Sequence, residues 1–301
     1  MRDGGVGSDG SPPVKLPSFI SADVAHVECE LNRIVPPDGA RPVRLHSAMR
    51  YTLLAPSKRV RAVLVLQSAR VCGSDARAIP AAAAVELIHA SSLILDDLPA
   101  LDNASLRRGR PSNHVAHGEA IALMAAFGLF NLAFATIARS YDPPTALRLT
   151  AIMSEAVGSN GLIGGEVEDL LAADQAISFD ALELIHRCKT GALFVAAATA
   201  GAVTAGAEPD QMSALGAYAK NLGLAFQIVD DLLDVEGDPA VTGKPRLADA
   251  KRTTFVSFSG VTGAHDLARE LCQTATAALE PFGSRADQLR ELASFVADRQ
   301  M

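Results

Sequence analysis

The stretch LILDDLPALDNASLRRGR runs from Leu93 to Arg110 and carries an unusual density of opposite charges. Asp96 and Asp97 stand side by side at the end of an apolar run, and Asp102 follows a few residues later. Three arginines come next, at Arg107, Arg108 and Arg110. Carboxylates beside an apolar surface repel one another, and burying them unpaired is costly. The stretch therefore predicts a helix end at which a cation compensates the carboxylates.

A second acidic cluster, FQIVDDLLD, repeats this pattern on another apolar segment. Residues spaced i, i+3 and i+7 share one helix face. The residues with this spacing are His89, Ser92 and Asp96 in the first segment, and Gln227, Asp230 and Asp234 in the second, with Asp231 beside them. Pro99 ends the first segment, so Asp102 is able to fold back toward Asp96.

Mg²⁺ is the cation that these clusters predict. It prefers oxygen ligands, keeps several waters and bridges to phosphate, and no Cys or His joins the clusters. The alternative is that each cluster is a solvated helix end paired with nearby arginines. Two clusters on apolar segments, with RRGR directly after the first, favour the metal. Arg107 and Arg108 suit bidentate capture of phosphate oxygens, so we expect a diphosphate clamp.

Further cations occur elsewhere in the chain. Lys58 and Arg61 lie one turn apart in SKRVRAVL, Lys189 and Thr190 begin an apolar segment, and Lys244 follows the second acidic cluster. Each alone is typical of a surface charge. Together they exceed what one diphosphate needs, which indicates two phosphorylated substrates.

Composition indicates one large domain. The chain has 301 residues, 49% of them hydrophobic, which is enough to bury a large core. A formal charge of −7 without a basic face argues against a nucleic-acid partner. Residues 1–17 are rich in Gly, Ser and Pro and predict a disordered leader before a domain over 18–301. Without an apolar signal core, and with four cysteines that match no zinc or redox spacing, a cytoplasmic protein is expected.

Apolar residues recur at helical spacing through most of the chain, which predicts an all-α bundle. The predicted helices cover 18–35, 43–55, 58–72, 78–98, 117–139, 143–158, 165–172, 178–205, 208–235, 252–260, 264–280 and 284–299. The segment 120–138 is uncharged and long enough to span a bilayer. Its Ala-rich and Gly-containing composition fits a buried core helix equally well, and we expect a core helix rather than a transmembrane span.

These motifs resemble those of the trans-isoprenyl diphosphate synthase (polyprenyl synthetase) family. The resemblance extends from about Met49 to about Gly260 through KRVR, the first acidic stretch, GGEVEDL, KTGALF, FQIVDDLLD and GKP, all in the family's order. It implies an isoprenoid-synthase fold, a helical bundle around a central cavity, and a homodimer. It also implies a Mg²⁺-dependent prenyltransferase that condenses isopentenyl diphosphate with dimethylallyl, geranyl or farnesyl diphosphate.

The resemblance assigns roles to individual residues. It implies metal binding by Asp96, Asp97, Asp102, Asp230, Asp231 and Asp234, and isopentenyl diphosphate binding by Lys58, Arg61, His89 and Arg108. It implies allylic diphosphate binding by Arg107, Lys189 and Lys244, with Arg252 as a weaker candidate. Thr190 and Gln227 match positions that place dipoles near the developing cation, and with Lys189 they form the catalytic set.

The chain departs from the family pattern at several of these motifs. Pro56 and Ser57 stand where two glycines are usual, which we expect to reshape the isopentenyl site. Glu166 replaces a glutamine and adds a carboxylate near the metals. Leu247 and Arg252 replace a Gly and a Lys after GKP. None of these changes removes a predicted metal ligand.

Product length follows from the residues one turn before Asp96. Ser91 and Ser92 lie there, beneath the expected diphosphate. Two serines leave the path of the prenyl tail open, which resembles synthases of geranylgeranyl diphosphate. Met124 and Phe127 are expected to close the cavity deeper down. Farnesyl diphosphate is the alternative product.

Two other classes of protein remain open. A class I terpene cyclase also has an Asp-rich helix, but its second metal motif is typically built from Asn, Ser and Glu, and it lacks the second diphosphate site. A non-catalytic regulatory subunit of another prenyl synthase is the second alternative. Such subunits usually lose one Asp motif, whereas both are complete here.

Overall fold

The computed structural model describes residues 17–173, 175–236 and 253–297, and these residues form a helical bundle. The first half contains α1 Ser18–Ile34, α2 Val43–Leu53, α3 Val60–Val71, α4 Ile79–Asp96, β1 Leu106–Arg107, β2 Arg110–Pro111, α5 Asn113–His117, α6 Glu119–Ser140 and α7 Pro143–Val157. The second half contains α8 Leu162–Ala172, α9 Phe179–His186, the π-helical segment η1 Arg187–Gly191, α10 Ala192–Thr204, α11 Pro209–Glu236, α13 Phe255–Ala278, the 3₁₀ segment η2 Glu280–Ala286 and α14 Asp287–Ala297. The all-α prediction is confirmed.

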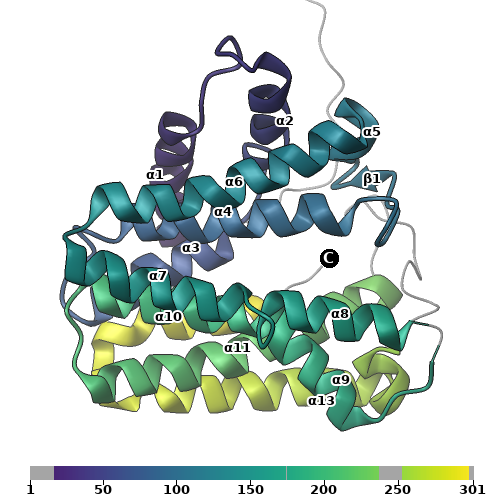
Figure 1. Ribbon diagram of the computed structural model, residues 1–301. Coiled ribbons are helices and arrows are strands. Elements are labelled where there is room, and N and C mark those ends of the chain that lie inside the picture. The colour runs from purple at the N-terminus through teal and green to yellow at the C-terminus, as the bar shows by residue number, and fades with distance from the viewer. Residues whose placement is uncertain (1–16, 174, 237–252, 298–301) are drawn as a thin grey trace, which may run out of the picture.

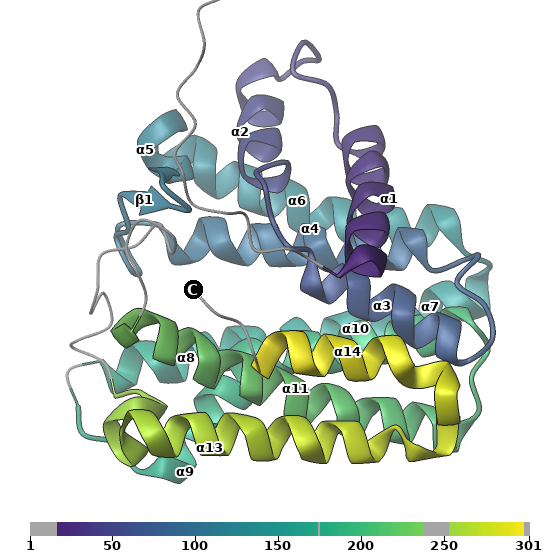
Figure 2. The same ribbon diagram turned by 180° about the vertical axis from the view of Figure 1, so that it is seen from behind.

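The long helices run in roughly one direction across the molecule, and α1 and α2 cross them at one edge (Figure 1). α4 packs between α3 and α6, α10 packs against α3, α7 and α11, and α11 packs against α13. α14 covers α11 on the opposite side of the bundle (Figure 2). Because α4 and α11 end on the same side of the molecule, their acidic ends are brought to one end of the bundle.

Small residues let the central helices approach closely. A Cβ at Gly201 of α10 would lie 2.1 Å from the carbonyl oxygen of Val65 on α3, so only glycine fits at this contact. α10 is buried around most of its circumference, as its apolar sequence predicts.

Four local features differ from the helices that the sequence predicts. Residues 106–111 form a two-stranded hairpin, which Arg108 and Gly109 turn with φ values of 53° and 71°. Positive φ at both positions is typical of a type I′ turn. A short helix, α5, precedes α6. The predicted helix 178–205 is interrupted by η1, and the predicted helices 252–260 and 264–280 join as α13 through a non-helical Gly260.

Two helices, α4 and α6, are long and apolar enough to cross a membrane by length and composition. In α4, 61% of the apolar window is buried in the bundle, but in α6 only 39% is. The expectation of a core helix at 120–138 is therefore correct for one face of α6 and wrong for the other. The physical reason is that α6 packs on α4, α2 and α7 from one side. That no helix spans a membrane stays a prediction.

A buried polar network ties α1 to α3. Asp23 is 1% exposed and accepts hydrogen bonds from both Nη atoms of Arg70, at 2.9 and 2.6 Å. It also accepts one from Gln67 Nε2 at 2.7 Å. Each polar group is therefore satisfied where burial would otherwise be costly.

Residues 1–16 of the predicted leader, which precede α1, lie outside the described residues.

Asp23→Asn is expected to lower the free energy of unfolding by roughly 2–4 kcal/mol, because it leaves Arg70 without its buried counter-charge. Urea denaturation followed by circular dichroism measures the change. Asp266→Asn is the matched control, because Asp266 pairs with Arg269 on the surface, where the two side chains are 65% and 63% exposed. Equal stability of the two variants would contradict a structural role for the Asp23 network.

Candidate active site

The first acidic cluster is built by the end of α4. Asp96 is the last residue of the helix, and Asp97 caps it. Pro99 follows, and the chain turns back so that the amide of Asp102 donates a 2.9 Å hydrogen bond to the carbonyl oxygen of Asp96. The expected return of Asp102 toward Asp96 is therefore present in the structure.

Asp97 pairs with Arg107 across this turn. The carboxylate of Asp97 is 3% exposed and accepts from Arg107 Nη2 at 2.6 Å and from Nε at 3.0 and 3.1 Å. The hairpin makes this contact possible, because Arg107 precedes the turn whereas Arg108 lies within it. Asp97, predicted as a metal ligand, and Arg107, predicted to bind allylic diphosphate, thus neutralise each other in this structure.

Lys189 neutralises a second pair of carboxylates. Its Nζ lies 2.7 Å from Glu166 and 2.6 Å from Asp169, both on α8. Burial alone would lower the pKa of Lys189, but Asp169, Glu166 and Asp96 outweigh that effect and raise the pKa. Lys189 therefore stays charged and holds η1 against α8.

Asp96 lies within this charged group. Its burial is the main reason that its pKa rises to about 7, and repulsion by Glu166 raises it further. Lys189 and Arg107 oppose the rise without cancelling it. At neutral pH the ionised carboxylate of Asp96 is therefore undercompensated by the protein's own cations, and an added cation would stabilise it.

The close approach of α8 and η1 depends on Gly165. A Cβ at this position would lie 2.3 Å from the backbone nitrogen of Lys189 and 2.8 Å from its Cα. The absence of a side chain at Gly165 therefore allows α8 and η1 to approach closely enough for Lys189 to contact Glu166. π-Helical segments often occur at functional sites, and this one carries both Lys189 and Thr190.

A chain of hydrogen bonds connects η1 with the second acidic cluster. Thr190 Oγ1 donates to Gln227 Oε1 at 2.9 Å, and Gln227 Nε2 donates to Asp231 Oδ1 at 3.0 Å. Asp231 Oδ2 also accepts from the backbone nitrogen of Phe255 at 3.0 Å. Asp231 is buried and joins α11 to the start of α13, whereas Asp230 and Asp234 are partly buried on the last turns of α11.

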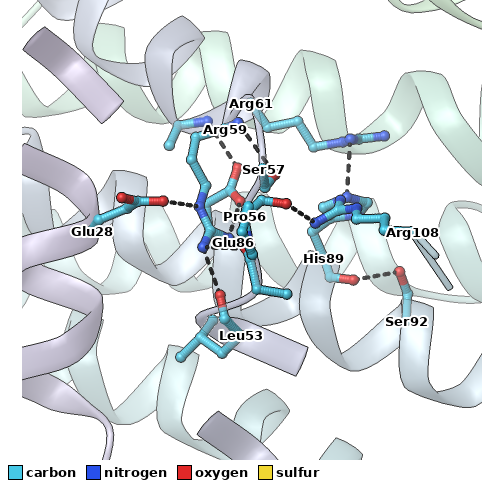
Figure 3. A network of polar contacts seen from close by, with 12 residues as sticks. Glu28, Leu53, Pro56, Ser57, Arg59, Arg61, Glu86, His89, Ser92 and Arg108 are labelled. Carbon is cyan, nitrogen blue, oxygen red and sulfur yellow. Dashed lines mark hydrogen bonds and ion pairs between the residues drawn. The ribbon is translucent and has the colours of Figure 1, made fainter. Parts of the chain in front are cut away.

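Three of the residues predicted to bind isopentenyl diphosphate, Arg61, His89 and Arg108, lie close together (Figure 3). Arg61 Nη1 lies 3.4 Å from His89 Nε2, and the Arg61 guanidinium lies 4.7 Å from the centre of the Phe194 ring. Lys58 Nζ lies 5.6 Å from the centre of the Phe295 ring. Burial lowers the pKa of His89 well below its usual value, and nearby arginines, led by Arg61, lower it further. His89 is therefore neutral, so its ring N–H can donate to an anion without repelling Arg61.

The fit of Mg²⁺ to this site rests on its oxygen donors. In the part of the chain that the structure describes, no three His, Cys, Asp or Glu side chains lie close enough to hold a metal ion by themselves. The carboxylate of Asp97 is turned toward Arg107. The carboxylate of Asp231 is turned toward Gln227 and the backbone nitrogen of Phe255. The protein's own cations do not fully compensate the charge of the Asp96 carboxylate, and the atoms that it offers to a metal are oxygens. These residues fit a hard cation that takes further ligands from a bound diphosphate and water.

The serines predicted to set product length differ in their surroundings. Ser91 is 2% exposed, and its hydroxyl donates to the carbonyl oxygen of Ala126 on α6 at 2.8 Å. Ser92 is partly buried, and its hydroxyl donates to the carbonyl oxygen of His89 at 3.0 Å. Met124 and Phe127 are 49% and 60% exposed in the single chain, and their part in closing the cavity stays a prediction. They lie on the face of α6 that turns away from the bundle.

Lys244 and Arg252, predicted to bind the allylic diphosphate, lie outside the described residues, as does Leu247.

Four structurally important residues were absent from the predicted site: Asp169, Arg59, Glu86 and Gly165. Glu86 lies within the otherwise apolar run AAAAVELI, and a single charge in such a run indicates a buried partner. Nothing in the sequence indicated that Arg59 is buried, because it is one of three cations in SKRVR. The close contact at Gly165 depends on a helix that lies elsewhere in the sequence.

Asp96→Asn is expected to stabilise the metal-free protein as pH rises. The raised pKa means that the fold favours protonated Asp96, so its contribution to stability falls between the unfolded pKa of 3.8 and the folded pKa of about 7. Removing the charge should therefore add roughly 2–4 kcal/mol to the free energy of unfolding at pH 8 and much less at pH 5. Urea denaturation at both pH values, without divalent cations, measures this difference. Asp287→Asn, on an exposed pair with Arg290, is the control, and an identical gain at both pH values would contradict the assignment.

Gly165→Ala is expected to destabilise the protein by about 1–3 kcal/mol, because its methyl group meets the backbone of Lys189. Gly216→Ala on α11 is the matched control, since no atom lies within 4 Å of its Cβ position. That change should stabilise by up to about 1 kcal/mol through helix propensity. Thermal unfolding of both variants distinguishes the two, and a neutral Gly165→Ala would show that η1 can move without cost.

Comparison with known proteins agrees with this architecture. A family model described as polyprenyl synthetase matches residues 42–277. A geranylgeranyl pyrophosphate synthase of Arabidopsis thaliana, named as chloroplastic, is 40% identical over 268 residues, which cover 86% of this chain and 77% of that protein. A farnesyl diphosphate synthase of Geobacillus stearothermophilus is 38% identical over 261 residues, which cover 84% of this chain and 87% of that protein.

A solved structure extends the comparison to the fold. The apo crystal structure of an FPP/GFPP synthase from Zymomonas mobilis matches with a TM-score of 0.83 at 32% sequence identity. The match covers 93% of this chain and 98% of that chain. Together with the motifs on α4, α8, η1 and α11, these similarities show that the chain belongs to the polyprenyl synthetase family.

Proposed function

We propose that this protein is a trans-prenyltransferase that condenses isopentenyl diphosphate with an allylic diphosphate and yields geranylgeranyl diphosphate. The observation that carries this proposal is that α4 carries a basic group around His89 in its middle and an acidic cluster at its C-terminal end. His89, with Arg61, and Asp96, with Lys189 nearby, lie two turns apart on one face of the helix. Seven residues of α-helix separate them by about 10 Å, which leaves room for two diphosphates side by side.

The allylic diphosphate would bind at the acidic end. Arg107 and Lys189 are ion-paired with the protein's own carboxylates, so a diphosphate would have to exchange partners with Asp97, Glu166 or Asp169. Asp96, Asp102, Asp230 and Asp234 would hold Mg²⁺. When bound, Mg²⁺ would supply positive charge that stabilises the leaving diphosphate.

The reaction needs stabilisation of a cation rather than a nucleophile from the protein. The allylic carbon–oxygen bond breaks, the diphosphate leaves, and the double bond of isopentenyl diphosphate attacks the carbocation before a proton is lost. Thr190 donates its hydroxyl hydrogen to Gln227, so its oxygen lone pairs remain available toward the positive carbon. Such a fixed dipole stabilises charge without reorganising during the reaction.

Further parts of the proposal are a homodimer and a cytoplasmic location. The exposed apolar side chains of Met124 and Phe127, one turn apart on α6, support an interface with a second copy. Neither the interface nor the location is needed for the chemistry derived above.

Two alternatives make different predictions for the isolated protein. Because one of the relatives is named a farnesyl diphosphate synthase, farnesyl diphosphate is the second candidate product. A non-catalytic regulatory subunit would elongate no starter by itself.

The isolated protein, supplied with Mg²⁺, isopentenyl diphosphate and dimethylallyl, geranyl or farnesyl diphosphate, is expected to give mainly geranylgeranyl diphosphate by mass spectrometry. Asp96→Ala should lower the rate at least about a hundredfold, because it removes a carboxylate that would hold the Mg²⁺ stabilising the leaving diphosphate. Asp266→Asn, in the exposed pair with Arg269, is the control and should retain full activity. Absence of elongation with every starter would instead support the regulatory subunit.

Ser92→Phe is expected to shorten the main product to farnesyl diphosphate. Ser92 shares the face of α4 that carries Asp96, so an aromatic ring there would stand in the path of the growing tail. Product distributions by mass spectrometry test this, with Ser92→Ala as the control that removes the hydroxyl but leaves the space. A folded Ser92→Phe variant that still makes geranylgeranyl diphosphate would place the floor of the tail site elsewhere. Ser91 is unsuited to this test, because it packs against α6.

A further inference from the structure

The loop between α2 and α3 is anchored by a buried arginine, Arg59. This side chain is 4% exposed although it lies beside Lys58 in a run of cations. Its Nη2 donates to the carbonyl oxygens of Leu53 at 2.7 Å and Ala55 at 3.3 Å. Its Nη1 donates to Glu86 Oε2 at 3.3 Å (Figure 3). The guanidinium therefore holds the end of α2, the loop and α4 at one point.

Glu86 completes this anchor from the middle of α4. It is 2% exposed, and its second carboxylate oxygen accepts a 3.3 Å hydrogen bond from the backbone nitrogen of Ala62, in the first turn of α3. Glu86 precedes His89 by one turn of the same helix. The Arg59–Glu86 pair therefore fixes the start of α3 relative to the part of α4 that carries His89.

The backbone at Arg59 adds a second constraint. Arg59 has φ 47° and ψ 34°, a left-handed conformation that is unfavourable for a non-glycine residue. The conformation persists because the surrounding contacts determine it. It also turns the chain so that Arg59 points toward Glu86 and Leu53, whereas Arg61 points toward His89 and Arg108 (Figure 3).

The loop is held from its other side as well. Ser57 Oγ accepts a hydrogen bond from the backbone nitrogen of Arg59 at 3.3 Å, and the carbonyl oxygen of Pro56 accepts one from Arg108 at 3.3 Å. Pro56 and Ser57 are the two residues that stand where the family pattern has glycines. The loop that carries Lys58 is thus tied to the hairpin as well as to α4.

We propose that Arg59, through its buried pair with Glu86, is a positioning residue that places Lys58, Arg61 and His89 for binding of isopentenyl diphosphate. This inference rests on the proposed function. Arg59 is too deeply buried to contact the substrate, so it acts through its neighbours. A displacement of Lys58 or Arg61 by about 1 Å is enough to lower substrate binding severely.

Steady-state kinetics of Arg59→Gln and Glu86→Gln test the proposal. Each variant should raise KM for isopentenyl diphosphate about tenfold to a hundredfold, while kcat and KM for the allylic diphosphate change less than about threefold. The double variant should resemble the single variants, because either change already breaks the pair. Arg59→Lys, which keeps the charge but loses the forked contacts to Leu53 and Ala55, should give a smaller rise and is the variant to use where Arg59→Gln folds poorly.

Asp23→Asn is the matched control, since it breaks another buried ion pair on α3 without contacting the loop. It should lower stability while leaving KM for isopentenyl diphosphate unchanged. A rise in all KM values together, or an equal rise in Asp23→Asn, would overturn the positioning role and leave Arg59 a purely structural residue.

Calorimetric titration with isopentenyl diphosphate separates this inference from the proposed reaction, because it needs no turnover. If the unaltered chain binds the compound but elongates no starter, the proposed reaction fails and the loss of affinity in Arg59→Gln still supports positioning. If Arg59→Gln and Glu86→Gln bind as tightly as the unaltered chain, the inference is wrong. If the unaltered chain does not bind isopentenyl diphosphate, both the reaction and the inference are wrong.

Discussion

The ion pairs of Lys189 with Glu166 and Asp169 are the interaction on which the site depends. They hold the π-helical segment η1 against α8 at 2.7 and 2.6 Å, and η1 in turn carries Thr190 into contact with Gln227 on α11. Through Asp96, whose pKa responds to Glu166 and Lys189, the same group reaches the end of α4. One cation thus couples the two acidic helices, which are otherwise far apart in the sequence.

This arrangement explains how so many carboxylates are tolerated at one end of a helical bundle. Four of them have partners inside the protein: Asp97 pairs with Arg107, Glu166 and Asp169 pair with Lys189, and Asp231 bonds to Gln227 and the backbone of Phe255. Arg107 and Lys189, the described cations predicted to bind the allylic diphosphate, are therefore ion-paired within the chain. Binding would exchange one anionic partner for another, so the net gain depends on differences between partners rather than on the full strength of each ion pair.

The basic group is arranged differently, because Lys58 and Arg61 lie near the aromatic rings of Phe295 and Phe194. Arg61 and His89 approach within 3.4 Å, which is tolerable because His89 is neutral. Arg59, by contrast, is buried with Glu86 and directs the loop that carries Lys58. Two neighbouring arginines in KRVR thus have different environments. Sequence spacing placed Lys58 and Arg61 one turn apart but offered no reason to expect that Arg59 is the more deeply buried of the two arginines.

The sequence by itself determined the helices, their apolar faces and the placement of Asp96 and Asp230 at helix ends, because such features depend on residues only a few positions apart. Tertiary structure decided which carboxylate meets which cation, since these pairs join segments that are distant in sequence. Arg107 reaches Asp97 because the chain turns back after α4 and the hairpin holds Arg107 on its first strand. Lys189 reaches Glu166 only because Gly165 lets α8 approach the backbone of η1. The tertiary structure also left one face of α6 exposed, because that helix packs against its neighbours from one side alone.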